Sequence, residues 1–207
     1  MDILYQDRRI LVCVKPFGVL SEELPELLRR ELGDGDACIH TVNRLDQPAG
    51  GVMVLARSQE ATRLLSRQVE EHSFQKEYLA IVCGELTGSG AMVDRLTRDR
   101  QTRRTLVADT PGKDVREARL RYEVLGHADG LSLVRIELET GRTHQIRAQF
   151  SSRGFPLCGD RKYGAPEAPI EGIALWSHKI AFRHPQTDER MCFSVEPPDA
   201  CPWNRFT

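Results

Sequence analysis

The sequence predicts a mixed α+β protein with a largely antiparallel central sheet and flanking helices. Short apolar runs bounded by Gly, Pro or Asp recur along the chain, as is typical of strands. Helical periodicity occurs in only three places, so helices do not alternate with strands as they do in a doubly wound fold. The 207 residues are 40% hydrophobic and 29% charged, which is ordinary for a folded protein, and we expect residues 1–207 to form a single domain.

The expected strands are runs rich in Val, Ile and Leu. Leu120–Leu125 and Leu131–Leu138 flank a stretch that contains Gly and Asp, residues 126–130, and this arrangement predicts an antiparallel hairpin. The other expected strands are Ile10–Val14, Val52–Ala56, Tyr78–Val82, Ile173–Ala174 with Ile180–Phe182, and Met191–Val195.

Three helices are expected. Pro25 near the start and Gly33 at the end delimit the first helix. Ser58 can cap the second, and Gly154 should end the third. The three segments are Glu23–Leu32, Ser58 to about Glu71, and Thr143 to about Arg153.

The charge distribution is uneven although the net charge is only −1. Residues 94–114 are predicted to form a basic inserted loop or hairpin that could bind phosphates. The alternative interpretation is an ordinary solvated face. The candidate phosphate-binding residues in this stretch are Arg98, Arg100, Arg103 and Arg104.

Several classes of protein are disfavoured by missing motifs. The six cysteines form no C-x-x-C pair, and His178 and His184 lack a nearby carboxylate doublet, so no metal site is expected. No stretch approaches membrane-spanning length, and the N-terminus has no secretory h-region. We therefore expect a cytoplasmic protein without a membrane partner. The sequence also lacks a P-loop and a G-x-S-x-G elbow.

Arg44 and Asp46 form the first candidate site. They are two residues apart, so on an extended chain their side chains point to the same side. Pro48 and the Gly50-Gly51 pair then turn the chain into an apolar strand. A functional site at the entrance of a strand and a surface turn with a local ion pair both fit this pattern.

Leu138–Arg147 form the second candidate site, because a strand end, a glycine turn and a helix start bring several donors together. Backbone amides at a helix N-terminus can bind an anion, and Arg142, His144 and Gln145 would add side-chain donors. Ordinary capping with solvated arginines is the alternative. Tyr78, taken alone, is interpreted as a structural residue of a strand.

These segments match a family pattern in the right order along the chain. Asn43–Gly51 is similar to H-R-L-D-x-x-T-S-G, and Lys76–Gly84 to K-x-Y-L-A-x-V-x-G. Thr140–Arg147 matches T-G-R-T-H-Q-I-R, Leu175–Ile180 is similar to L-H-S-H-K-I, and Lys15–Gly18 to K-P-x-G. Together they resemble the RluA-like family of RNA pseudouridine synthases.

The resemblance implies an isomerase that converts uridine in RNA to pseudouridine without a metal or redox cofactor. Asp46 would be the catalytic carboxylate, with Arg147 as its cationic partner. Tyr78 would stack on the uracil and assist proton transfer, and Leu175 would form an apolar wall of the pocket. Arg44 would fill the space that the flipped base leaves. The expected substrate contacts are Arg142, His144 and Gln145.

The resemblance also implies the partner, a stem-loop of tRNA or rRNA held by Arg98, Arg100, Arg103 and Arg104. We expect a monomer without a separate S4 domain. The chain departs from the pattern at Asn43, at Ala49-Gly50 and at Trp176, which bears on which RNA is bound. Two alternatives remain open: an inactive RNA-binding paralogue on the same fold, and a metal-independent ribonuclease that uses His144.

Overall fold

A computed structural model describes residues 1–206 of the chain. By its internal contacts the chain divides into two compact units. The first unit comprises Met1–Lys76 and Ser177–Glu196, and the second comprises Glu77–Trp176 and Pro197–Thr207.

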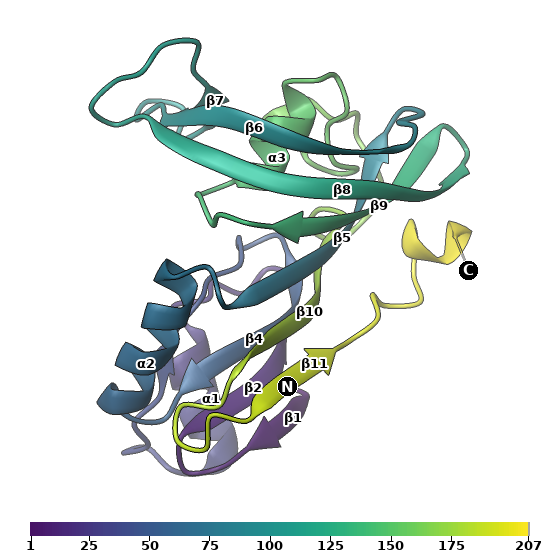
Figure 1. Cartoon of the computed structure of the whole chain (residues 1–207). Coiled ribbons are helices and arrows are strands. Elements are labelled where there is room, and N and C mark those ends of the chain that lie inside the picture. The colour runs from purple at the N-terminus through teal and green to yellow at the C-terminus, as the bar shows by residue number, and fades with distance from the viewer. Residues whose placement is uncertain (207) are drawn as a thin grey trace. The chain divides into compact units, whose positions relative to one another are not determined.

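The first unit is a small sheet covered by helices. Its strands are arranged in the order β1-β2-β4-β10, and β11 pairs with β10 (Figure 1). The short strand β3 pairs with β4. β2 pairs antiparallel with β4, with Val12 opposite Val54. The strands are β1 (Ile3–Gln6), β2 (Ile10–Lys15), β3 (His40–Thr41), β4 (Gly50–Ala56), β10 (Leu175–Arg183) and β11 (Arg190–Ser194).

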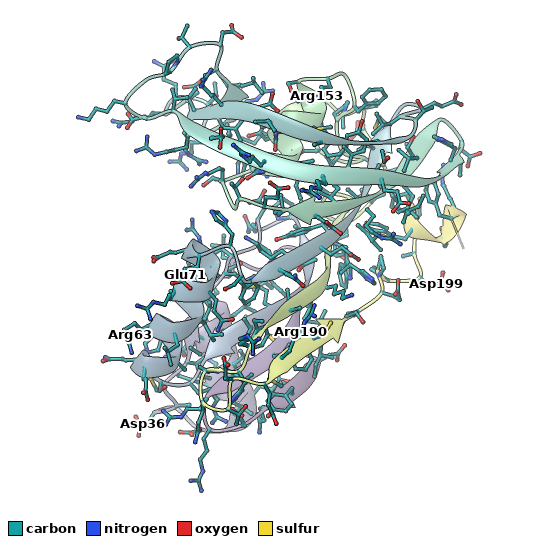
Figure 2. The ribbon with its side chains drawn as sticks, in the orientation of Figure 1. Asp36, Arg63, Glu71, Arg153, Arg190 and Asp199 are labelled. Atoms are coloured by element: carbon teal, nitrogen blue, oxygen red, sulfur yellow. The ribbon has the colours of Figure 1, made fainter. Side chains whose placement is uncertain are left out.

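Two helices accompany this sheet, α1 (Leu24–Leu32) and α2 (Gln59–Glu70). The predicted end signals act as expected, because Gly33 takes the left-handed conformation after α1 and the Ser58 hydroxyl accepts a hydrogen bond from the Ala61 amide at the start of α2. Ala61 and Leu65 of α2 pack into an apolar core with the strands. The charged side chains of Arg63 and Glu71 lie on the exposed side of this segment (Figure 2).

The second unit is built on a twisted antiparallel sheet of order β5-β9-β8-β6-β7. A two-residue turn joins β8 to β9, and both Asp129 and Gly130 have positive φ there, as this kind of hairpin requires. The elements are β5 (Gln75–Cys83), β6 (Ser89–Arg98), β7 (Thr105–Val107), β8 (Arg116–Ala128), β9 (Leu131–Leu138), α3 (Gln145–Ser151), η1 (Arg161–Tyr163) and η2 (Trp203–Arg205).

The expected α+β class is confirmed, with two corrections and one choice between alternatives at the level of elements. The third helix, α3, is shorter than predicted, because His144 has a φ of 52° and so cannot be part of the helix. Ile173 and Ala174 precede β10 instead of lying in a strand. Of the two forms expected for residues 94–114, a loop or a hairpin, the structure has the hairpin, since residues 94–98 belong to β6 and β7 pairs antiparallel with it.

Two features are absent from the described residues. None of their helices is both long and apolar enough to cross a membrane. Over residues 1–206, no three His, Cys, Asp or Glu side chains are grouped so that they could hold a metal ion.

Candidate active site

Asp46 lies in the first unit, in a loop of residues 43–49 that is fastened on both sides of the carboxylate. On one side, the buried Ser21 hydroxyl donates to the carbonyl of Leu45 at 2.8 Å and accepts from the Leu45 amide at 3.0 Å. On the other side, the Gly18 amide donates to the carbonyl of Gln47 at 3.0 Å. The half-buried Asp46 side chain is therefore presented from a fixed backbone.

Lys15 adds a buried cation beneath this loop. The residue is 0% exposed, and its ammonium donates to the carbonyls of Pro16, Val19 and Gln47 at 2.9, 2.7 and 3.2 Å. Burial lowers the pKa of Lys15 to about 8, and the Asp46 carboxylate opposes that shift. Lys15 therefore ties three backbone segments together and supplies positive charge near Asp46.

Sequence reasoning did not single out Lys15 as a candidate site residue. The K-P-x-G match at Lys15–Gly18 was the available signal. The spacing could not show that the side chain turns back into the protein to reach a carbonyl 32 residues further along the chain.

Two neighbours of Asp46 differ sharply in environment. Arg44 is exposed, and its guanidinium pairs with Glu22 at 3.0 Å. Asn43, where the family pattern has His, is buried, and among the described residues neither its amide nitrogen nor its amide oxygen has a hydrogen-bond partner. Such a group is unfavourable in a protein interior, since an unpaired buried polar group costs about 1–3 kcal/mol.

Gly51 shows why the turn after Asp46 needs glycine. Its φ is 117°, and a Cβ at this position would lie 2.4 Å from the carbonyl oxygen of Ser177. The Ser177 hydroxyl donates to the carbonyl of Val52 at 2.9 Å. β4 and β10 therefore approach each other closely where the chain leaves the Asp46 loop.

Arg147 lies in the second unit, on α3, and is 4% exposed. Its Nε and Nη2 donate to the two carboxylate oxygens of Asp160 at 2.6 and 2.9 Å, in a bidentate pair. Asp160 is only 1% exposed, so both charges are almost fully removed from solvent. The guanidinium also lies over the ring of Tyr163, with Cζ 4.8 Å from the ring centroid.

Tyr78 and Leu175 are buried residues of the second unit. Tyr78 lies on β5 opposite Ile136 of β9 and is 6% exposed. Leu175 is the first residue of β10, and its amide donates to the carbonyl of Ile173 at 2.7 Å. Both residues belong to regular strands, so the sheet defines their positions.

The segment of residues 140–147 divides into a structural and an exposed part. The side-chain amide of Gln145 is buried, accepts from the Thr140 hydroxyl and the Arg142 amide, and donates to the carbonyl of Arg119. Gln145 thus shapes the turn. Arg142 is exposed, with Nε bonded to the carbonyl of Glu117, and His144 faces the hydroxyl of Tyr163 at 2.8 Å.

The basic hairpin, residues 98–105, carries the predicted phosphate-binding arginines of the second unit. At its tip, Asp99 accepts hydrogen bonds from the Gln101 amide and the Thr102 hydroxyl, which fixes the turn. Arg98, Arg100 and Arg103 are exposed, whereas Arg104 is half-buried and lies over the ring of Tyr163 at 5.1 Å. The four arginines therefore separate into three surface charges and one packed against the protein.

Solved structures share the fold of this chain. The human protein RNA pseudouridylate synthase domain containing 1 superposes with a TM-score of 0.82 over 96% of this chain and 84% of that chain, at 23% identity. The fold is thus that of the pseudouridine synthases.

Sequence relatives then identify the family. A family model described as RNA pseudouridylate synthase matches residues 9–152. The dual-specificity RNA pseudouridine synthase RluA of Escherichia coli is 32% identical over 209 residues, covering 93% of this chain and 91% of that protein. An uncharacterized RNA pseudouridine synthase of Bacillus subtilis, YhcT, is 34% identical over 202 residues, and the chain covers 66% of its length. The chain belongs to the RNA pseudouridine synthase family, a family of isomerases.

Proposed function

We propose that this protein isomerises specific uridines of a structured RNA to pseudouridine, with Asp46 as the catalytic carboxylate. The observation that carries the proposal is the Asp46 loop. Its backbone is bonded on both sides of the carboxylate, and the buried Lys15 ammonium binds the residue that follows. A reacting group held in one orientation lowers the entropic cost of reaching the transition state.

We infer the roles of the other candidate site residues from their chemistry and their surroundings. Tyr78 offers an aromatic face for the uracil and a hydroxyl for proton transfer. Arg147 supplies a guanidinium that stays charged when buried, and Leu175 supplies an apolar wall. Arg44, which is exposed, would enter the space that the flipped base vacates. Arg142 and His144 would contact the RNA. Gln145, which is buried, would contribute to substrate binding by ordering the turn that carries them.

The RNA itself would be a stem-loop of transfer or ribosomal RNA. The exposed charges of the basic hairpin support this proposal, since phosphate contacts supply most of the sequence-independent affinity for nucleic acids. The compartment would be the cytoplasm, because all six cysteines are free and three of them are exposed.

The test is a pseudouridine map of RNA from a strain that lacks this protein, before and after incubation with the purified protein. New pseudouridines at defined positions are expected, with the RNA intact. RNA that is bound but unchanged would favour the inactive paralogue. Shortened products that disappear in the His144→Ala variant would favour the ribonuclease.

A further inference from the structure

Tyr163 lies at the end of η1, 3% exposed, and interacts with residues from three separate segments of the second unit. Its hydroxyl accepts a hydrogen bond from the backbone amide of Thr105, where β7 begins, at 2.7 Å. The same oxygen lies 2.8 Å from Nδ1 of His144, just before α3. One hydroxyl can accept from the amide and donate to the imidazole at the same time.

The ring of Tyr163 makes a second set of contacts. The guanidinium groups of Arg104 and Arg147 both lie over it, with Cζ 5.1 and 4.8 Å from the centroid. An arginine over an aromatic face is attracted by the ring electrons, and more strongly when the pair is withdrawn from water. The buried Nε of Arg104 has no hydrogen-bond partner among the described residues.

Arg147 is therefore held from two directions. Asp160 binds the guanidinium edge in a bidentate pair, and Tyr163 packs against its face. Asp160 and Tyr163 belong to the same short turn, in which the Tyr163 amide donates to the Asp160 carbonyl at 2.9 Å. A shift of Tyr163 would change the position of the Arg147 guanidinium.

The basic hairpin is held to the same tyrosine. Thr105 contacts the Tyr163 hydroxyl through its amide and the carbonyl of Thr143 through its own hydroxyl, at 2.8 Å. Charges of the hairpin also gather here. Burial lowers the pKa of Lys162, which adjoins Tyr163, and repulsion from Arg147, Arg98 and Arg103 lowers it further. An RNA phosphate bound by the hairpin would relieve this repulsion.

We propose that Tyr163 is a positioning residue that couples the basic hairpin to Arg147, so that RNA bound on the hairpin fixes the Arg147 guanidinium in its working orientation. The inference rests on the proposed function, since it takes the hairpin as an RNA contact and Arg147 as part of the active site. The hydroxyl contacts Thr105 of the hairpin and His144, and the ring contacts Arg147 together with Arg104 of the hairpin. The two halves can be separated by substitution.

Two variants separate them, Tyr163→Phe and Tyr163→Leu, with Tyr122→Phe as the matched control. Tyr122 belongs to the same unit and packs edge-on against Phe150, away from the hairpin residues named above. Tyr163→Phe removes the hydroxyl and keeps the ring over both arginines. Tyr163→Leu removes both. Thermal unfolding of each variant records any general loss of stability.

The first readout uses no RNA and no activity. Trypsin should cut at the exposed Arg100 and Arg103 of the hairpin tip about ten-fold faster in Tyr163→Phe than in wild type, because the variant lacks an anchoring hydrogen bond. Mass spectrometry identifies the cut sites. Cutting at the wild-type rate, as in Tyr122→Phe, would overturn the anchoring role.

The second readout is the split between KM and kcat. Tyr163→Phe should raise KM for the RNA about ten-fold with little change in kcat, and Tyr163→Leu should also lower kcat by about ten-fold or more. Changes in kcat and KM that merely follow the fall in melting temperature would overturn the coupling. A wild-type protein that forms no pseudouridine would contradict the proposed function. The trypsin assay would still test whether Tyr163 anchors the hairpin, because it requires neither RNA nor activity.

Discussion

The ammonium of Lys15 donates a hydrogen bond to the carbonyl oxygen of Gln47, 3.2 Å away, and so ties the end of β2 to the residue that follows Asp46. Two further carbonyls, of Pro16 and Val19, complete its surroundings. Burying a lysine ammonium is unfavourable unless it is well paired, so its position beside the Asp46 loop indicates a role in holding that loop and its charge.

Replacing Lys15 by Met should lower turnover by about ten- to hundred-fold and leave RNA affinity nearly unchanged, because the Asp46 loop loses a fastening while the basic hairpin is untouched. Single-turnover kinetics and equilibrium binding measure the two quantities. Lys179→Met, on the exposed side of β10, is the matched control. Equal effects of the two substitutions would contradict this role.

The pH dependence of the same residue gives an independent prediction. Burial lowers the pKa of Lys15 to about 8, below its value in the unfolded chain. Between these two pKa values the unfolded state binds more protons, so the Lys15 contribution to the free energy of unfolding should rise with pH. Turnover should fall over the same range, as the positive charge beside Asp46 is lost.

These opposite trends are measured by comparing wild type with Lys15→Met from neutral pH to about pH 9.5, in urea unfolding and in turnover. The stability difference between the two proteins should grow in favour of wild type as pH rises. The alkaline fall in turnover should be absent from the variant. If turnover of the variant also falls at alkaline pH, the fall is caused by a group other than Lys15.

The Arg147–Asp160 pair should behave as a buried ion pair. Asp160→Ala leaves the guanidinium without its bidentate partner and should destabilise the protein by about 3–5 kcal/mol in urea unfolding. The double variant Arg147→Met, Asp160→Leu should recover most of that stability and remain inactive. Retained activity in the double variant would exclude Arg147 from the active site.

Much of the fold and of the candidate site could be predicted from the sequence. The features that could not be predicted depend on contacts between residues far apart in the chain. The helix signals at Gly33 and Ser58 follow from local backbone preferences. The motif around Asp46 indicates a site because it is contiguous. The pairing of Tyr163 with Thr105 joins residues 58 apart, and no spacing rule reveals it. His144 was predicted to lie in a helix but has a left-handed backbone conformation just before it. In this position its side chain contacts the hydroxyl of Tyr163.

The surface charges of the basic hairpin should control RNA binding. Replacing Arg98, Arg100 and Arg103 by Glu should weaken RNA binding. The plot of log affinity against log salt, which slopes downward, should become shallower by about one for each phosphate that is no longer neutralised. Arg104 is left unchanged because it packs on Tyr163. Arg63→Glu on the exposed side of α2 serves as the control (Figure 2). An unaltered salt slope would make the hairpin an ordinary solvated face.

The role of Asp46 as the catalytic carboxylate is tested most directly by Asp46→Asn, which keeps the size of the side chain and removes its charge. The measurement is pseudouridine formed per protein molecule in a single turnover, on the RNA that the wild type modifies. We expect wild-type RNA affinity, unchanged melting temperature and no pseudouridine. Product formation at the wild-type rate by the Asn variant would contradict the assignment of Asp46 as the catalytic carboxylate.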